Sequence, residues 1–128
     1  MEAAQPLAVI MKVLRIVANV ATDRTADAER FYREFLGLQC VMDLGWIVTF
    51  AGEEDMRPQI SFAVEGGSGT KVPDISVEVD DLEEALKSAK RLGYPIEYGP
   101  IVEDWGVRRF YTRDPFGRLV NIVSHSEG

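Results

Sequence analysis

The chain has 128 residues, of which 46% are hydrophobic and 27% charged, a composition typical of one soluble globular domain. It contains no apolar run near the ~18 residues that a membrane-spanning helix needs, which argues against membrane association. The formal net charge of −7 argues against nucleic acid as a partner and is compatible with a cationic ligand.

The sequence starts without the basic region of a secretory signal, which predicts a cytoplasmic protein. Cys40 is the only cysteine, so neither an internal disulfide nor a cysteine-based zinc site can form. His125 is the only imidazole and lies near the end of the chain. The sequence therefore offers little support for a Ser-His or Cys-His catalytic pair, because His125 is the only residue that could act as the base. We predict no catalytic residue.

The first half of the chain reads as one strand, one helix and three further strands. Residues 13–20 alternate, with an apolar set (Leu14, Ile16, Ala18 and Val20) opposite Arg15, Val17 and Asn19. Capping residues at 21–25 predict a helix that runs to about Leu36 and ends at Gly37. Its predicted core-facing stripe is Ala28, Phe31, Tyr32, Phe35 and Leu36. Strands are expected at 39–44, 46–51 and 58–64.

The same order is predicted again after a Gly-rich linker at 65–71, which we expect to be flexible. Residues 74–79 alternate as a strand, and Asp80 and Asp81 can cap a second helix that ends at Leu92-Gly93. Strands near 95–102, 107–113 and 118–124 complete the set. The sequence thus predicts a single α+β domain of two βαβββ modules, at about 11–64 and 72–124, with helices on one face of a mostly antiparallel sheet.

The last two strands flank Asp114-Pro115-Phe116-Gly117, which has the residues of a type I turn. If Asp114 pairs with Gly117, Phe110 faces Asn121 and shares its side of the sheet with Arg108. A β-bulge would turn the first of the two strands over.

Polar residues gather on the face of the predicted strands that points away from the helices. They are Arg15, Asn19, Gln59, Ser61, Asp74, Ser76, Glu78 and Asn121. This face could line a ligand site, and it could equally be a solvated sheet surface.

The paired modules and the C-terminal pattern resemble the vicinal oxygen chelate superfamily, which holds glyoxalases, extradiol dioxygenases, fosfomycin-resistance enzymes and bleomycin-resistance proteins. The pattern is Trp105-Gly106-x-Arg108-x-Phe110-x-x-x-Asp114-Pro115-x-Gly117, and the likeness covers nearly the whole chain. The resemblance implies that the sheet curves into a cup and that the protein is a homodimer.

Metal-dependent members of that superfamily carry a ligand on the first and last strand of each module. Matching by position puts the equivalents at Arg15, Ser61, Asp74 and Asn121. Arginine cannot ligate a metal, and serine and asparagine are weak neutral donors. We therefore predict no metal site and no cofactor. If Arg15 and Asp74 converge, we expect an ion pair or a polar clamp for a ligand.

The resulting prediction is a non-metal small-molecule-binding protein similar to the bleomycin-resistance proteins, which would sequester a hydrophobic or cationic aromatic compound such as an antibiotic. Trp105 and Phe110 would stack on the ligand, and Trp46 is a weaker candidate for the same role. The predicted ligand-binding residues are Arg15, Ser61, Asp74, Glu78, Trp105, Arg108, Phe110 and Asn121.

Other functions stay open at this point. The chain could be a glyoxalase- or dioxygenase-type enzyme, a lyase or an oxidoreductase, with an atypical metal or a cofactor-free site. It could also be a scaffold whose sheet face is a protein interface.

Overall fold

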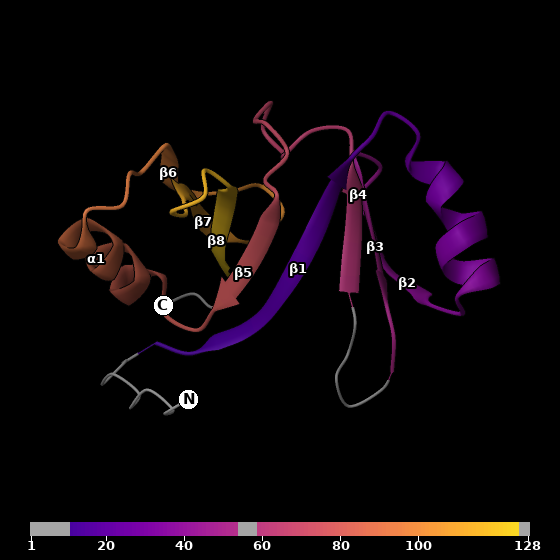
Figure 1. Ribbon diagram of the computed structural model, residues 1–128, viewed down its shortest axis with the longest axis horizontal. Helices are drawn as coiled ribbons and strands as arrows, with labels where there is room; N and C mark the ends of the chain where they lie inside the picture. Colours follow the sequence, from indigo (N-terminus) through magenta and orange to yellow (C-terminus); the bar gives the residue numbers. More distant parts are fainter. Residues whose placement is uncertain (1–10, 54–58, 126–128) are drawn as a thin grey trace.

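The computed structural model describes residues 11–53 and 59–125 and has a mixed α+β fold built on one curved sheet (Figure 1). Its eight strands follow the order β2-β3-β4-β1-β5-β8-β7-β6. The strands are β1 (Val13–Ala21), β2 (Gln39–Asp43), β3 (Ile47–Ala51), β4 (Gln59–Ala63), β5 (Ile75–Val79), β6 (Tyr98–Val102), β7 (Arg108–Arg113) and β8 (Leu119–Ser124). The pairs β1–β4 and β5–β8 are parallel, whereas all other neighbours are antiparallel. The predicted fold class is confirmed.

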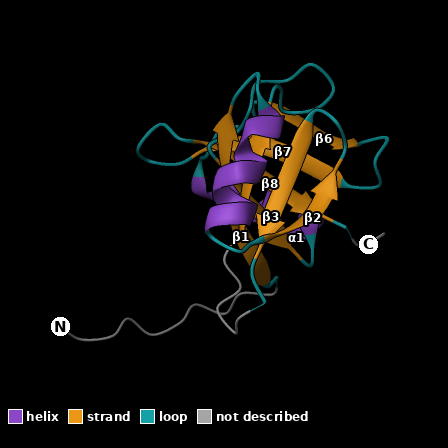
Figure 2. Ribbon diagram, turned by 90° about the vertical axis from the view of Figure 1, so that its right-hand side faces the viewer, coloured by secondary structure: helices purple, strands orange, loops and turns teal. Residues whose placement is uncertain are grey.

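The order of elements repeats along the chain. β1 is followed by helices η1 (Thr25–Asp27) and η2 (Glu29–Phe35) and then by β2–β4, whereas β5 is followed by helix α1 (Leu82–Leu92) and then by β6–β8. β1 and β5 meet as antiparallel neighbours in the middle of the sheet. The two helical layers lie at opposite ends of the molecule in Figure 1, and Figure 2 shows the first of them against the strands of its own half.

Helix α1 begins and ends where its sequence predicts. The carboxylate of Asp81 accepts a hydrogen bond from the Glu84 amide at 3.2 Å, and Gly93 closes the helix with a φ of 83°. The apolar face packs on β5 and β7 in a core of Val79, Leu82, Ala85, Leu86 and Phe110. Neither α1 nor any other helix in the described part of the chain has the length and apolar character of a membrane span.

The first helix differs from its prediction because it winds as a π-helix. The Leu36 amide bonds to the Phe31 carbonyl, five residues back, instead of to the residue four back. This wider winding leaves Ala28 buried and Tyr32 packed on β3 and β4, whereas Phe31, Phe35 and Leu36 are exposed. The predicted core-facing stripe is therefore wrong for those three residues.

The outer face of β1 carries an apolar strip that neither helical layer covers (Figure 1). Leu14, Ile16 and Val20 keep 57%, 60% and 40% of their surface exposed. Their neighbours Arg15, Val17 and Asn19 point to the opposite side of the sheet, as the alternation predicts. An uncharged strip of this kind on a central strand is typical of a surface that another molecule covers.

The register of the C-terminal hairpin is one residue away from its prediction. Arg113 pairs with Leu119 and Phe110 with Ile122, because Gly117 adopts a φ of 81° and adds one residue to the type I turn. Every side chain of β7 thus takes the other face of the sheet. Phe110 lies under α1 instead of beside Asn121.

The linker between the two halves is packed against β7, contrary to the flexibility expected from its glycines. Gly66 and Gly67 are both buried. A Cβ on Gly66 would collide with the Tyr111 hydroxyl, and one on Gly67, whose φ is 90°, would lie 2.5 Å from the Trp105 ring. The missing side chains of these glycines allow the linker backbone to pack directly against Tyr111 and Trp105, and this packing fixes the linker in place.

Candidate functional site

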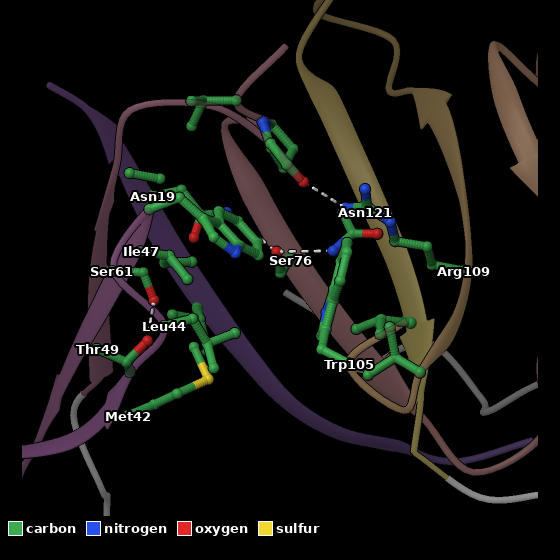
Figure 3. A pocket seen from close by; sticks show the side chains of 18 of the residues that line it. Asn19, Met42, Leu44, Ile47, Thr49, Ser61, Ser76, Trp105, Arg109 and Asn121 are labelled. Carbon is green, nitrogen blue, oxygen red and sulfur yellow. Dashed lines mark hydrogen bonds between the residues drawn. The ribbon is translucent and has the colours of Figure 1, made fainter. Parts of the chain in front are cut away.

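A pocket of about 300 Å³ opens on the face of the sheet that points away from the helices (Figure 3). Strands from both halves of the chain line it. Its volume is at the lower end of the range for small-molecule sites.

Neutral polar side chains form the floor of the pocket. Ser76 on β5 lies at its centre, and its hydroxyl oxygen accepts hydrogen bonds from Asn19 Nδ2 at 3.0 Å and from Asn121 Nδ2 at 3.1 Å (Figure 3). Thr49 on β3 and Ser61 on β4 share a third hydrogen bond, of 2.7 Å. The floor can therefore bind polar groups by hydrogen bonding without adding a charge.

Apolar and aromatic side chains form the walls. Met42, Leu44 and Ile47 lie on the side of the first half (Figure 3). Trp46 and Trp105, one from each half, meet edge to face with their ring centroids 5.1 Å apart. Walls of this kind favour a flat, hydrophobic ligand.

Arg109 on β7 joins the linker to the second half beside the pocket. Its side chain is 3% exposed and donates hydrogen bonds to the carbonyl oxygens of Gly66 at 2.7 Å and Gly67 at 3.2 Å. The guanidinium also lies 5.0 Å from the ring centroid of Trp105. The arginine thus fixes both the linker and one aromatic wall of the pocket.

Glu103 neutralises this buried arginine through a contact of 2.7 Å. Burial alone raises the pKa of Glu103, but hydrogen bonds from Ser68, Tyr98 and Arg109 outweigh it and hold the pKa below the ordinary glutamate value. Burial also raises the pKa of the Tyr111 hydroxyl, which bonds to Thr70 at 2.8 Å and keeps its proton at neutral pH. The wall is therefore held by a fully paired charge network.

Arg15, Glu78 and His125 form a second paired group at the other side of the pocket. The Arg15 Nε atom lies 2.5 Å from Glu78 Oε1, and His125 Nδ1 lies 2.9 Å from Glu78 Oε2. Arg15 and His125 line the pocket, whereas Glu78 does not. The arginine charge is therefore already balanced by a carboxylate.

Four of the eight predicted ligand-binding residues line the pocket, namely Arg15, Ser61, Trp105 and Asn121. Asp74 does not line it, and its carboxylate accepts a hydrogen bond of 2.8 Å from the Leu119 amide. Arg15 and Asp74 do not converge, so the condition for an ion pair between them is not met; the antiparallel register of β1 and β5 places Glu78 opposite Arg15 instead.

Two other predicted residues lie on the wrong side of the sheet for this pocket. Phe110 belongs to the core under α1 with 1% of its surface exposed, and Arg108 bonds to Glu83 of α1 at 2.6 Å. Both errors follow from the extra residue in the hairpin turn. The position next to them, Arg109, faces the site instead.

Two further pocket residues belong to the polar face that the strand alternation predicts, although they are not among the eight predicted ligand-binding residues. Asn19 shares a face of β1 with Arg15, and Ser76 shares a face of β5 with Glu78. Trp46 was the weaker candidate for an aromatic wall and lines the pocket. No local pattern marked Arg109, whose role depends on a linker more than 40 residues away.

The residues present do not fit the divalent metal that some vicinal oxygen chelate proteins use. Within residues 11–53 and 59–125, no three His, Cys, Asp or Glu side chains come together as a metal site. Among the four matched positions, Arg15 is ion-paired, Asp74 lies outside the pocket lining, and Asn121 contributes an amide.

Replacing Arg109 by methionine should lower the free energy of unfolding at pH 7 by about 3–5 kcal/mol, because Glu103 is left buried without its partner. The folded-state pKa of Glu103 is lowered, so its ionised form stabilises the fold above the unfolded pKa of about 4.3. That stabilisation is lost as the pH falls through the folded pKa.

Urea unfolding between pH 7 and pH 3 measures both effects. Glu103→Gln should reduce the loss of stability at acid pH. An Arg109→Met protein as stable as the wild type, or an unchanged acid slope in Glu103→Gln, would contradict this account.

Comparisons with known proteins agree with the architecture. A family model described as Glyoxalase/Bleomycin resistance protein/Dioxygenase superfamily matches residues 12–122. No curated protein matches the chain.

Solved structures with a similar fold come from several bacteria. A structure described as NAD-dependent benzaldehyde dehydrogenase from Legionella pneumophila has a TM-score of 0.67 at 16% identity, over 86% of this chain and 98% of that one. Methylmalonyl-CoA epimerase from Mycobacterium tuberculosis has a TM-score of 0.63 at 15% identity, over 95% and 93% of the two chains. A superfamily member from Vibrio splendidus 12B01 has a TM-score of 0.56 at 13% identity, over 86% and 97%.

At these identities the solved structures establish the fold alone. The family model is different, because it covers nearly all of the described chain, from β1 into β8. The chain belongs to the glyoxalase/bleomycin resistance protein/dioxygenase superfamily.

Proposed function

We propose that the protein is a non-metal, small-molecule-binding member of its superfamily that sequesters a hydrophobic aromatic compound, such as an antibiotic. The observation that carries this proposal is the pocket of about 300 Å³, with aromatic and aliphatic walls around a neutral polar floor. Hydrophobic walls with a few placed polar groups are typical of sites that hold organic ligands.

Most of the charges around the pocket are paired within the chain, which supports a ligand held mainly by its apolar surface. Glu78 and Glu103 are each paired with an arginine, so neither carboxylate is free to attract a cation. Glu65 lines the pocket and accepts a hydrogen bond from the Gly69 amide at 2.8 Å. The acidic net charge of the whole chain therefore lies mostly outside this site.

An enzyme is the second candidate, and the His125–Glu78 contact is the observation that favours it. A histidine bonded through Nδ1 to a carboxylate resembles the base-and-orienter pair of general acid–base catalysis. Such a protein would be a cofactor-free lyase or isomerase. We favour binding because His125 is exposed.

We also propose that the protein is a homodimer in which a second copy covers the apolar strip on β1. The strip contains no charged residue, so the same surface can pair with itself across a two-fold axis without repulsion. The strip also lies on the outer face, away from the pocket, which leaves each site complete within its own chain.

Trp105→Ala should weaken binding of the neutral fluorescent probe N-phenyl-1-naphthylamine by about 1–3 kcal/mol, because it removes an aromatic wall. A fluorescence titration measures this affinity. Phe116→Ala is the matched control, since Phe116 is 87% exposed in the hairpin turn.

Equal affinity of the two variants would contradict a role for Trp105 in binding. Loss of the fold in Trp105→Ala would show instead that the residue is structural. Chemical conversion of a bound aromatic compound, lost in His125→Ala, would favour the enzyme.

Light scattering after size-exclusion chromatography should give twice the chain mass. Ile16→Glu should give a monomer, because it places a charge on the apolar strip. Val102→Glu, at an equally exposed site on edge strand β6, should stay dimeric. A monomeric wild type, or a dimeric Ile16→Glu protein, would contradict this interface.

A further inference from the structure

The apolar wall of the pocket continues past the cavity onto edge strand β2. Val41, Met42 and Leu44 all line the pocket, yet they keep 53%, 37% and 42% of their surface exposed. Met42 and Leu44 lie across the pocket from Trp105 (Figure 3). These three residues form an exposed apolar surface beside the cavity, which we call the β2 shelf.

A β-bulge in β2 gives the shelf two neighbouring side chains. Successive side chains of a regular strand point to opposite faces of the sheet, so Val41 and Met42 would not both line the pocket. The register between β2 and β3 shifts between Cys40 and Met42, which leaves Val41 as an extra residue in the ladder. The bulge therefore directs Val41 to the pocket side, where Met42 already lies.

The shelf is aliphatic, in contrast to the tryptophan wall. Its side chains are those of valine, methionine and leucine, and Ile47 continues it into the pocket. Asp43, the charged residue of this stretch, lies opposite Val48, a core residue on the helix side of the sheet. The Asp43 carboxylate accepts a hydrogen bond from the Gly45 amide at 2.9 Å. The shelf therefore favours a saturated hydrocarbon group over a polar one.

We propose that the ligand has two parts, an aromatic ring inside the pocket near Trp105 and an alkyl arm that leaves the pocket over the β2 shelf. The cavity of about 300 Å³ is small for such sites, so a larger ligand extends beyond it. The shelf is continuous with the pocket wall, and exposed apolar surface beside a pocket is typical of ligand contact. This inference rests on the proposed function and specifies the shape of its ligand.

A series of 4-alkylphenols with ethyl, butyl and hexyl groups tests this inference, because only the alkyl arm changes along the series. Each affinity is measured by displacement of N-phenyl-1-naphthylamine. Full burial of one methylene group raises affinity about fourfold, so a half-buried methylene on the shelf should raise it about twofold. 4-Hexylphenol has four more methylenes than 4-ethylphenol and should therefore bind the wild-type protein about 16-fold more tightly.

The double variant Val41→Thr/Leu44→Gln should lower this hexyl-to-ethyl ratio to about fourfold or less, because it places polar groups on the shelf. Val41→Thr alone should also lower the ratio, and it serves as the second variant if the double variant does not fold. The matched control is Val102→Thr/Ile101→Gln, which makes similar changes on the other edge strand, β6, outside the pocket lining. Val102 and Ile101 are 67% and 41% exposed, and this control should preserve the wild-type ratio.

Equal affinity of 4-ethylphenol and 4-hexylphenol for the wild-type protein would overturn this inference. An unchanged ratio in the shelf variants would also overturn it, because the alkyl arm would then lie away from β2. The proposed function would stand in both cases, since N-phenyl-1-naphthylamine still binds. If neither that compound nor any alkylphenol binds, the proposed function is overturned together with this inference.

Discussion

The buried contact between Arg109 and Glu103 fixes the linker between the two halves, and with it one wall of the pocket, against the second half. A buried ion pair is tolerated only when the two charges are close together and their other hydrogen-bonding groups also have partners. The Arg109–Glu103 pair meets this condition. Arg109 uses its remaining donors on the carbonyl oxygens of Gly66 and Gly67, which come from the linker between the halves. The linker is thus fixed by the same residue that stacks against Trp105. One residue therefore fixes both the linker and an aromatic wall of the pocket.

The pocket floor has a different chemistry from a metal centre, although it lies on the strands where some members of the superfamily bind metals. Amide and hydroxyl groups from β1, β5 and β8 bond to one another around Ser76. The nearby charges of Arg15 and Arg109 are satisfied by glutamates. Such a site offers little binding free energy to a metal ion, whereas it can bury a neutral organic molecule favourably. For this reason we favour ligand binding over catalysis as the function.

Local pattern was enough to predict most of the fold. Alternation located the strands and the polar inner face of β1, and Asp80 and Asp81 predicted the cap of α1, which Asp81 supplies. The errors arose where the outcome depends on a single backbone conformation or on distant pairing. One left-handed residue, Gly117, turned over every side chain of β7. The partner of Arg15 depended on the register between β1 and β5, which are about 60 residues apart in the chain and whose pairing no local pattern specifies.

The most direct test of the central claim, a neutral binding pocket without a metal, is the metal content of the protein. Inductively coupled plasma mass spectrometry would be applied to protein purified without chelators and again after dialysis against zinc, nickel and manganese salts. We expect far less than one metal per chain in both samples, because the pocket offers amides, hydroxyls and paired charges in place of metal ligands. One tightly bound metal per chain would contradict this account, and an enzyme would then be the favoured function.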